Sequence, residues 1–337
     1  LIPLIKLEKG EDYVNFIKDY EVMHWGTLIN PILPVEKDIF DYFGIFLIDR
    51  TKVFKQGKDY KIVESIPTGT INKTFTQLID ERAEELKEIY KDKQLVLMWS
   101  GGLDSTTAFF ALIKADVKIT MHINHHAIAE YPLLAAQILS NKYPNVISKY
   151  VHTGALGSDK LGIPDWTHPM EFNFREWLKS NSNAHVITGE IGDQVFGSAV
   201  SYVHSFGTRQ DYYRKRVPES VANALEQTVT QFLNKPEGRI SFGEWTWAVN
   251  FTCKYQNVLL RMGYLWRVSP LLGNCTHFFN TKDLQRWSMQ NYEKNASYQS
   301  QLVYKQPMRE YIVANGGDQT WAWNKRKIGS LCQVMYT

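Results

Sequence analysis

The spacing of apolar residues changes sharply near residue 94. Between Thr74 and Tyr90, apolar side chains recur every three or four positions with charged residues between them, which predicts an amphipathic helix. From Gln94 to Trp99 the chain is instead almost wholly apolar, as in a strand buried on both faces of a parallel sheet. A helix followed by a buried strand is therefore the first unit that the pattern predicts.

Apolar runs and helical spacings then alternate as far as residue 188. The predicted strands cover 94–99, 117–123, 146–151 and 185–188, and the predicted helices cover 105–114, 131–143 and 171–180. This alternation predicts βαβ units and an α/β fold, with a parallel sheet that carries helices on both faces. Residues 208–330 show no clear strands and are expected to be mainly helical, with a break at Lys235–Gly238.

The N-terminal residues follow a different pattern. Residues 1–73 are predicted to form a small α+β unit, because apolar runs at 43–49 and 60–63 flank a polar turn, as in a β-hairpin. We therefore expect two domains, one at 1–73 and a larger one at 74–337 with a helical C-terminal part. The tryptophans of that part are interpreted as core residues rather than as base-stacking residues, because their spacing is helical.

The composition excludes several classes of protein. The 337 residues are 44% hydrophobic and 22% charged, which is ordinary for a globular protein and excludes a disordered chain. The three cysteines are too few and too scattered for a disulfide framework or a metal site. No apolar run approaches the roughly 18 residues of a membrane span. These features predict a cytoplasmic protein that does not cross a membrane.

Charge is unevenly divided along the chain. Residues 1–200 carry 21 basic and 26 acidic side chains, whereas residues 201–337 carry 17 basic and 9 acidic ones, within a net charge of +3. The basic part is compatible with a solvated surface or with an anionic partner such as polyphosphate, nucleic acid or an acidic substrate. Charge alone leaves both interpretations open.

The most distinctive motif lies between the first predicted strand and the helix after it. It is Ser100-Gly101-Gly102-Leu103-Asp104-Ser105-Thr106. At the carboxyl end of a parallel strand, glycines let the backbone approach an anion, and the next helix directs its N–H groups and positive dipole end to the same point. The hydroxyls add donors, and Asp104 is suited to hold Mg²⁺ against phosphate oxygens. Neither the Walker A nor the G-x-G-x-x-G pattern is present. The alternative interpretation is a glycine turn with a capping Asp and Ser.

Three histidines, His122, His125 and His126, follow the second predicted strand. They lack neighbouring cysteines and suitably spaced carboxylates, which disfavours a metal site. We expect them to form a strand-end cluster near a bound nucleotide.

A second turn rich in glycine and carboxylates follows the predicted strand at 185–188. Its sequence is Gly189-Glu190-Ile191-Gly192-Asp193-Gln194-Val195-Phe196-Gly197. Because the carboxyl ends of parallel strands meet at one edge of a sheet, this turn is expected to face Ser100–Thr106. The alternative is a pair of helix-capping acids, since carboxylates are common near helix N-termini.

Together the two motifs resemble a known family. Ser100–Ser105 resembles the pyrophosphate loop of the ATP pyrophosphatases with an adenine-nucleotide α-hydrolase-like fold. Residues 189–197 are similar to the G-E-G-x-D-E-x-F-G-G segment of the asparagine synthetase and β-lactam synthetase family. The resemblance implies ATP and Mg²⁺ as ligands, with Asp104 and Asp193 sharing the metal ion and Glu190 near the reacting carbonyl.

The same resemblance assigns nucleotide binding to Ser100–Thr106 and Gly189. Three positions depart from the family pattern. Ile191 stands where glycine is usual, Gln194 where an acid is usual, and Ser198 where a second glycine is common. These departures concern the side that binds the acceptor more than the side that binds ATP.

Three C-terminal segments extend the resemblance. Ser269–Leu272 is similar to the family's proline-containing segment, Lys305–Ile312 to its K-x-x-L-R element, and Lys325–Gly329 to its R-x-K-x-G pattern, with lysine in the arginine position. By this match Lys327 is the catalytic lysine, which stabilises the charge that develops during adenylation, and Lys305 belongs to the catalytic set. A solvated basic tail is the alternative.

The resemblance implies an ATP-dependent, AMP-forming ligase. A substrate carboxylate would attack the α-phosphorus of ATP to give an acyl-adenylate and pyrophosphate, and an amine or ammonia would then form the amide and release AMP. Residue 1 is leucine and the first cysteine is Cys253, which argues against the N-terminal glutaminase of asparagine synthetases. The nitrogen is therefore expected from ammonia, from an amine substrate or from the activated molecule itself.

Two further interpretations stay open. One is a nucleic-acid modification enzyme of the same ATP class, which the basic C-terminal part suggests. The other is a catalytically silent ATP-binding subunit or scaffold, which Gln194 and the missing glutaminase suggest. A partner chain or a homo-oligomer is compatible with each interpretation, and the sequence does not identify the carboxylate or the amine.

Overall fold

Two compact units make up the computed structural model. The residues that it describes are 47–53, 64–123, 125–150, 180–197, 219–256, 258–259, 274–296 and 304–325. The sheet unit comprises the described residues of 70–192, 270–287 and 299–337, and the helical unit comprises those of 1–69, 193–269 and 288–298. Each unit has its own set of buried apolar side chains.

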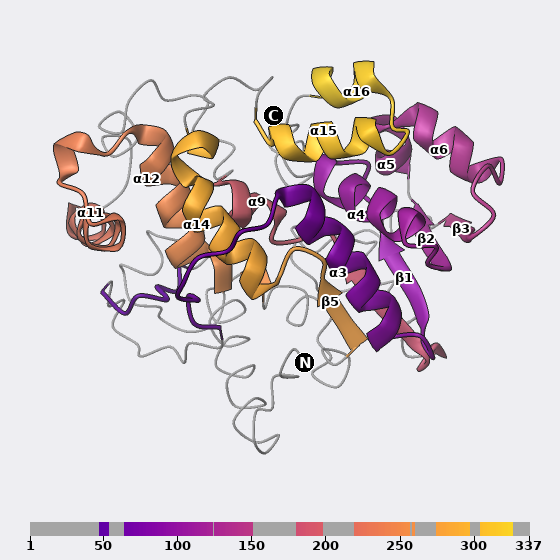
Figure 1. Cartoon of the computed structure of the whole chain (residues 1–337), viewed down its shortest axis with the longest axis horizontal. Helices are drawn as coiled ribbons and strands as arrows, with labels where there is room; N and C mark the ends of the chain where they lie inside the picture. Colours follow the sequence, from indigo (N-terminus) through magenta and orange to yellow (C-terminus); the bar gives the residue numbers. More distant parts are fainter. Residues whose placement is uncertain are drawn as a thin grey trace, which may run out of the picture. The chain divides into compact units, whose positions relative to one another are not determined.

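The sheet unit is built on five parallel strands (Figure 1). They are β1 (Gln94–Met98), β2 (Ile119–Ile123), β3 (Val146–Tyr150), β4 (Ala184–Thr188) and β5 (Cys275–His277). Their order is β3-β2-β1-β4-β5, and every neighbouring pair is parallel. The predicted parallel sheet and its four predicted strands are confirmed.

The central strands are buried on both faces, as their mainly apolar runs predict. Every residue of β2 and β4 is buried, and Leu95, Val96 and Leu97 of β1 are at most 4% exposed. Leu95 pairs with Ile119 of β2 on one side and with His185 of β4 on the other. β1 therefore lies at the centre of the sheet, with its three middle residues buried and Gln94 exposed at its start.

The strand order reverses its direction at β1. β2 and β3 follow on one side of β1, whereas β4 and β5 lie on the other side. In such a sheet, the loops after the two strands that flank the reversal run in opposite directions and leave room for a ligand at the carboxyl edge. The loops after β1 and β4 are the two motifs that the sequence singled out.

β5 was not predicted from the sequence. It has only three residues, Cys275 to His277, and they form neither an apolar run nor an alternating pattern. The local sequence therefore gives no indication of a strand. Its pairing with β4, through Val186 with Cys275 and Thr188 with His277, creates the strand. The expectation that strands end near residue 200 is thereby corrected by one short strand.

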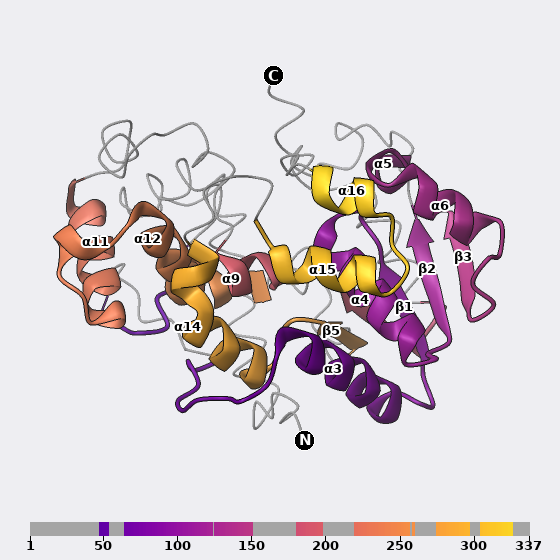
Figure 2. The ribbon, with the colours of Figure 1, turned by 45° about the horizontal axis from the view of Figure 1, so that its top comes forward.

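Helix α4 occupies the centre of the sheet unit. The described helices that lie wholly in this unit are α3 (Phe75–Ile89), α4 (Leu103–Lys114), α5 (His125–Glu130), α6 (Pro132–Leu139), α15 (Gln306–Ala314) and α16 (Gln319–Asn324). α4 packs against β1, α3 and α15, and Figure 2 shows α3, α4 and α15 side by side. Every residue from Ser105 to Leu112 is buried, as in a helix that is covered on all sides.

The predicted helices within 74–90, 105–114 and 131–143 are confirmed by α3, α4 and α6. The helix predicted at 171–180 lies outside the described residues apart from Ser180. The described helices α3, α4 and α15 form one packed group. The prediction of helices on both faces therefore stays a prediction for the second face.

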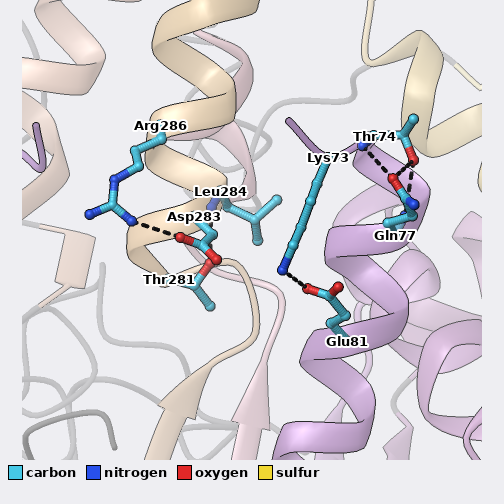
Figure 3. Close-up of polar contacts among 8 residues, drawn as sticks. All are labelled: Lys73, Thr74, Gln77, Glu81, Thr281, Asp283, Leu284 and Arg286. Carbon is cyan, nitrogen blue, oxygen red and sulfur yellow. Dashed lines mark hydrogen bonds and ion pairs between the residues drawn. The ribbon is translucent and has the colours of Figure 1, made fainter. Parts of the chain in front are cut away.

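Side-chain caps determine where α3 and α14 (Lys282–Ala296) begin. The Thr74 hydroxyl accepts from the Gln77 N–H (3.2 Å), and the Gln77 side chain accepts from the Thr74 N–H (2.8 Å). The Thr281 hydroxyl accepts from the Leu284 N–H at the start of α14 (3.1 Å). Figure 3 shows both caps. Each cap satisfies N–H groups that have no partner inside their own helix.

The described part of the helical unit includes Trp245 and Trp247 in its core. Its described elements are part of α9 (Gly192–Phe196), α11 (Glu219–Leu233), a 3₁₀ turn (Glu237–Arg239), α12 (Phe242–Val249), a π-helical turn (Asn250–Lys254) and the second half of α14. Trp245 and Trp247 are at most 1% exposed, and the Trp247 ring stacks on Phe251 and Tyr292. The core interpretation of these two tryptophans and the break after α11 are confirmed.

Residues 47–53 pack on the π-helical turn. The N–H groups of Ile48 and Arg50 donate to the carbonyls of Cys253 (2.7 Å) and Thr252 (2.9 Å). The Arg50 guanidinium also donates to the Phe251 carbonyl (3.0 Å). Residues 47–49 form no strand, and the rest of the predicted hairpin at 43–49 and 60–63 lies outside the described residues. The domain predicted at 1–73 stays a prediction.

None of the helices in the described ranges combines the length and the apolarity that crossing a membrane requires.

Candidate functional site

The first turn, defined as Ser100–Gly102, links β1 to α4. Gly101 has a φ of +74°, in the left-handed region that glycine adopts without strain. A Cβ at this position would lie 2.6 Å from the Ala127 carbonyl oxygen and 2.6 Å from the Glu130 Cβ. Glycine is therefore required twice, by the backbone conformation and by the close approach of α5.

Hydroxyl groups hold the first turn against α4. The Ser105 hydroxyl accepts from the Ser100 N–H (3.1 Å), and the Ser100 hydroxyl accepts from the Gly102 N–H (3.3 Å). Thr106 is fully buried, and its hydroxyl accepts the Trp99 indole N–H (3.1 Å). Of the three hydroxyls that were predicted to bind the nucleotide, Ser100 is exposed whereas Ser105 and Thr106 support the turn from inside.

The second turn, defined as Gly189–Gly192, links β4 to α9 and lies against the start of α4. A Cβ on Gly189 would lie 2.7 Å from the Ser105 nitrogen, and a Cβ on Gly192 would overlap the Asp104 carboxylate. The two glycines thus allow the second turn to contact the first helical turn of α4. The structure brings the two motifs together, as the strand order requires.

Ile191 carries the unusual backbone of the second turn. Its φ is +75°, which is rare and strained for a β-branched residue. Its side chain is 1% exposed. This is the position at which the resembled family has glycine, so the glycine-like conformation persists and burial of the isoleucine offsets the strain.

The second turn is anchored to β5. The Glu190 N–H donates to the Thr188 hydroxyl (3.2 Å), which also bonds His277 Nδ1 (2.6 Å). Burial, reinforced by the negative charge of Glu190, raises the pKa of the Cys275 thiol. Glu190 is half-buried and therefore lies at the carboxyl edge within electrostatic reach of β5.

The two predicted metal ligands, Asp104 and Asp193, belong to different units of the structure. Asp104 lies in the first turn of α4, and Asp193 is the second residue of α9. Asp193 belongs to the helical unit, so a metal ion shared with Asp104 stays a prediction. In the part of the chain that the structure describes, no group of three or more histidine, cysteine or acidic side chains is arranged to hold a metal ion.

His122 is the histidine of the predicted cluster whose side chain is described. It lies on β2 and is 5% exposed. Burial, together with the positive charge of Lys149, lowers the pKa of His122 to about 4, so the imidazole is neutral near pH 7. The side chains of His125 and His126 lie outside the described part.

Lys305 reaches the Asp104 carboxylate from the start of α15. Its Nζ contacts both carboxylate oxygens and lies 2.6 Å from Oδ2. The Lys305 side chain is 4% exposed and that of Asp104 is 26% exposed. Lys305 also has a φ of +56°, a left-handed conformation that is uncommon for lysine. The sequence predicted both residues as site residues but not their pairing.

Arg309 connects the segment that carries Lys305 with the segment that carries Lys325. Its guanidinium donates to the carbonyls of Tyr304 (2.7 Å), Ala322 and Lys325 (3.0 Å). It is 1% exposed, and burial lowers its pKa. Because Tyr304 directly precedes Lys305 and Ala322 lies in α16, one buried cation holds both segments in place.

Helix α16 docks on the junction between α5 and α6. The Trp321 ring stacks on Tyr131, with centroids 3.8 Å apart and planes within 5°. The Trp321 indole N–H donates to the Glu130 carbonyl (2.8 Å), and Lys325 pairs with the Glu130 carboxylate. Since the Glu130 Cβ borders Gly101, this docking delivers Lys325 to the first turn.

Lys327, the predicted catalytic lysine, lies outside the described residues. The described range ends two residues before it, at Lys325. The sequence reasoning missed Glu130, Tyr131 and Trp321. No local pattern marks them, because their role arises from contacts between segments that are far apart in the chain.

The site therefore combines four segments at the carboxyl edge of the sheet. They are the first turn with the start of α4, the second turn, Lys305, and the segment that ends at Lys325. No protein-family model matches the chain, and no curated protein sequence matches it either.

Proposed function

We propose that the protein is an ATP-dependent, AMP-forming ligase that activates a substrate carboxylate and transfers it to an amine or ammonia. The observation that carries the proposal is the convergence of the first turn, the second turn, Lys305 and the segment ending at Lys325 in one unit. These are the segments that resemble the asparagine synthetase and β-lactam synthetase family.

The fold supports the same proposal. An all-parallel sheet of order β3-β2-β1-β4-β5 carries its two glycine-rich turns at the point where strand order reverses, which is where such sheets bind nucleotides. We extend the proposal to an adenine-nucleotide α-hydrolase-like fold. The loop between β1 and the buried helix α4 would then receive the pyrophosphate part of ATP.

The residues of the site fit a polyphosphate. The dipole of α4 favours negative charge at the first turn, and the Ser100 hydroxyl is exposed there. Lys305 brings an ammonium group to Asp104 at the start of α4, and Lys325 brings one to Glu130, whose Cβ borders Gly101; both groups are suited to phosphate oxygens. The site thus offers the N-terminal end of a helix, a hydroxyl and two cations.

A magnesium ion fits as a partner of the phosphates. Mg²⁺ is commonly bound by one or two carboxylates together with substrate phosphates, rather than by a cage of protein ligands. Asp104 is 26% exposed and lies at the start of α4, so it can supply one such carboxylate. When bound, the ion would neutralise phosphate charge and orient the leaving pyrophosphate.

In the proposed reaction, a carboxylate oxygen of the substrate attacks the α-phosphorus of ATP. The bond between the α-phosphorus and the bridging oxygen breaks, and pyrophosphate leaves. The amine nitrogen then attacks the acyl carbon, loses a proton and displaces AMP. Lys305, Lys325 and Lys327 would stabilise the developing negative charge, and Glu190 would orient the amine or accept its proton.

A product assay tests this proposal. The purified protein is incubated with ATP, Mg²⁺ and sets of amino acids, other carboxylates and small amines, and AMP and pyrophosphate are measured together. We expect equal amounts of AMP and pyrophosphate only when a matched carboxylate and amine are both present. Release of ADP and orthophosphate with the same substrates would contradict the proposal.

A matched pair of variants controls the assay. Asp104→Asn removes a carboxylate of the site, whereas Asp92→Asn removes an exposed one beside β1. We expect Asp104→Asn to lower pyrophosphate release at least 100-fold and Asp92→Asn to leave it unchanged. Equal rates for the two variants would argue against a role for Asp104.

The pairing of Lys305 with Asp104 favours one second candidate, a nucleotide-binding protein without turnover. A lysine ammonium on both oxygens of the carboxylate leaves that carboxylate electrically satisfied without a metal ion. This candidate predicts ATP binding, no pyrophosphate release with any substrate, and a cellular function that survives Asp104→Asn.

A further inference from the structure

The ion pair between Lys305 and Asp104 has a geometry that restricts what else Asp104 can bind. Nζ contacts both carboxylate oxygens and is 2.6 Å from Oδ2. Gly192 lies against the same carboxylate, where even a methyl group would overlap it. Two of the approaches to Asp104 are therefore taken by protein atoms.

A metal ion and the ammonium group make competing demands on this carboxylate. Mg²⁺ binds oxygen at about 2.1 Å, and Nζ is already in contact with both oxygens. Two cations this close repel strongly where water is largely excluded, and the Lys305 side chain is only 4% exposed. Full occupation of Asp104 by both cations is therefore unfavourable.

We propose that Lys305 and a phosphate-bound divalent cation compete for Asp104, and that Lys305 moves to the phosphate oxygens when the cation takes its place. The inference rests on the proposed function, because it assumes that the site receives a metal–polyphosphate complex. Lys305 is then a partner-exchanging residue, and the cost of leaving Asp104 is offset by its new contact with phosphate.

The backbone around Lys305 confines this exchange to the side chain. Arg309 donates to the Tyr304 carbonyl (2.7 Å), which holds the residue directly before Lys305. The Lys305 carbonyl accepts from the N–H groups of Met308 (2.9 Å) and Arg309 (3.2 Å). With its backbone held on both sides, Lys305 can turn between two acceptors without unwinding α15.

Lys325 provides the matched control. Its ammonium also pairs with a carboxylate beside the first turn, that of Glu130, and the pair is similarly shielded, with side chains 11% and 23% exposed. Glu130 is on α5 and was not predicted as a metal ligand. Removal of Lys325 should therefore weaken phosphate binding without changing the competition at Asp104.

The experiment measures how strongly Mg²⁺ enhances the binding of inorganic pyrophosphate. Dissociation constants are obtained by calorimetry with Mg²⁺ and with a chelator, and their ratio is the metal enhancement. In Lys305→Met, metal-free pyrophosphate meets Asp104 without the Lys305 ammonium group and binds more weakly, whereas Mg²⁺ no longer competes with that group. We expect the enhancement to rise at least tenfold above that of the unmodified protein.

The other variants have distinct expected results. Lys325→Met should weaken binding by a similar factor with and without Mg²⁺, so that the enhancement stays within twofold of the unmodified protein. Asp104→Asn, alone or combined with Lys305→Met, should lower the enhancement at least tenfold. An unchanged enhancement in Lys305→Met overturns the competition.

A measurement on the unmodified protein covers the case in which Lys305→Met fails to fold. With ¹⁵N-labelled lysine, the Nζ signal of Lys305 should shift on saturation with magnesium pyrophosphate. A Lys305 signal that keeps its ion-paired position under saturation overturns the inference. Its failure is separable from that of the proposed function, because the release of AMP and pyrophosphate is measured independently of the metal enhancement.

Discussion

The first turn (Ser100–Gly102) and the second turn (Gly189–Gly192) adopt the same unusual backbone conformation with different residues. Gly101 has a φ of +74° and Ile191 a φ of +75°. At Gly101 the space for a Cβ is already taken by α5, with the Ala127 carbonyl oxygen 2.6 Å away. At Ile191 the side chain has room and is 1% exposed.

This difference shows when a left-handed turn requires glycine. The conformation costs about 1–2 kcal/mol for a residue with a Cβ, and full burial of an isoleucine contributes about 1.5–3 kcal/mol. Burial can therefore offset the strain at Ile191. At Gly101 no side chain can be added without displacing α5, so packing rather than strain decides the residue.

The two turns are also held by different means. The first turn is held from outside by α5. Helix α16 in turn holds the end of α5, because the Trp321 ring stacks on Tyr131, the residue that follows α5. The second turn is held by its own strand, through the Thr188 hydroxyl and His277 of β5. The comparison predicts that the first turn responds to steric changes and the second to changes in burial.

The largest effect of adding a single methyl group is expected from Gly101→Ala. The added methyl group meets the Ala127 carbonyl and Glu130 and also imposes left-handed strain, so the free energy of unfolding should fall by about 2–5 kcal/mol. Gly316→Ala is the control, because Gly316 has a φ of +92° but nothing within 4 Å of a Cβ. The control should lose about 1 kcal/mol. Equal losses of unfolding free energy for the two variants, measured by urea denaturation, would show that steric contact with α5 does not decide the residue at Gly101.

Acid should weaken the strands on either side of the first turn. Burial is the main cause that lowers the pKa of His122 on β2 and of His185 on β4 to about 4, from 6.5. Between these values the unfolded chain binds protons that the folded chain does not, so the free energy of unfolding falls as pH decreases from 6.5 to 4. The loss should approach about 3 kcal/mol for each histidine.

Urea denaturation at pH 7.5 and pH 4.5 measures this loss, and His185→Gln separates the two strands. The imidazole of His185 bonds the Thr276 hydroxyl (2.8 Å) and stacks on Tyr90, so the variant loses some stability at both pH values. Its further loss on acidification should be about half that of the unmodified protein. An equal acid-dependent loss would show that β4 does not contribute.

The smallest and most diagnostic effect is the difference between Ile191→Gly and Ile191→Ala. Both variants lose the buried side chain and should be destabilised by about 2–5 kcal/mol. Only glycine also relieves the left-handed strain, so Ile191→Gly should be about 1 kcal/mol more stable than Ile191→Ala. Thermal denaturation of the two variants side by side is the measurement. Greater stability of the alanine variant would place Ile191 outside the left-handed region.

Much of the fold was predictable from local pattern. β1 appears as an unbroken apolar run after Gln94, and β2 and β4 appear as mainly apolar runs that each contain one histidine. α3 shows helical spacing with a capping box at Thr74 and Gln77. These signals are local. Burial of a strand on both faces leaves an apolar run in the sequence, and burial of a helix on one face leaves a helical period. β5 escaped prediction because three residues cannot establish a period.

The candidate site was predictable only as a set of separate segments. The sequence marked Ser100–Thr106, Glu190, Lys305 and Lys325–Gly329 as chemically relevant. It could not show that Thr106 is fully buried under the Trp99 indole. Nor could it show that Lys305 pairs with Asp104. Both facts depend on which side of α4 faces the sheet.

The sequence by itself determined the buried strands, the two glycine-rich turns and the lysines near the C-terminus. The tertiary structure alone decided that these parts meet, that Glu130 and Trp321 bring Lys325 to the first turn, and that Ile191 takes the place of a glycine. The physical reason is that period and propensity act between neighbours in the chain. Ion pairs, ring stacking and steric exclusion act between neighbours in space, wherever the chain brings them.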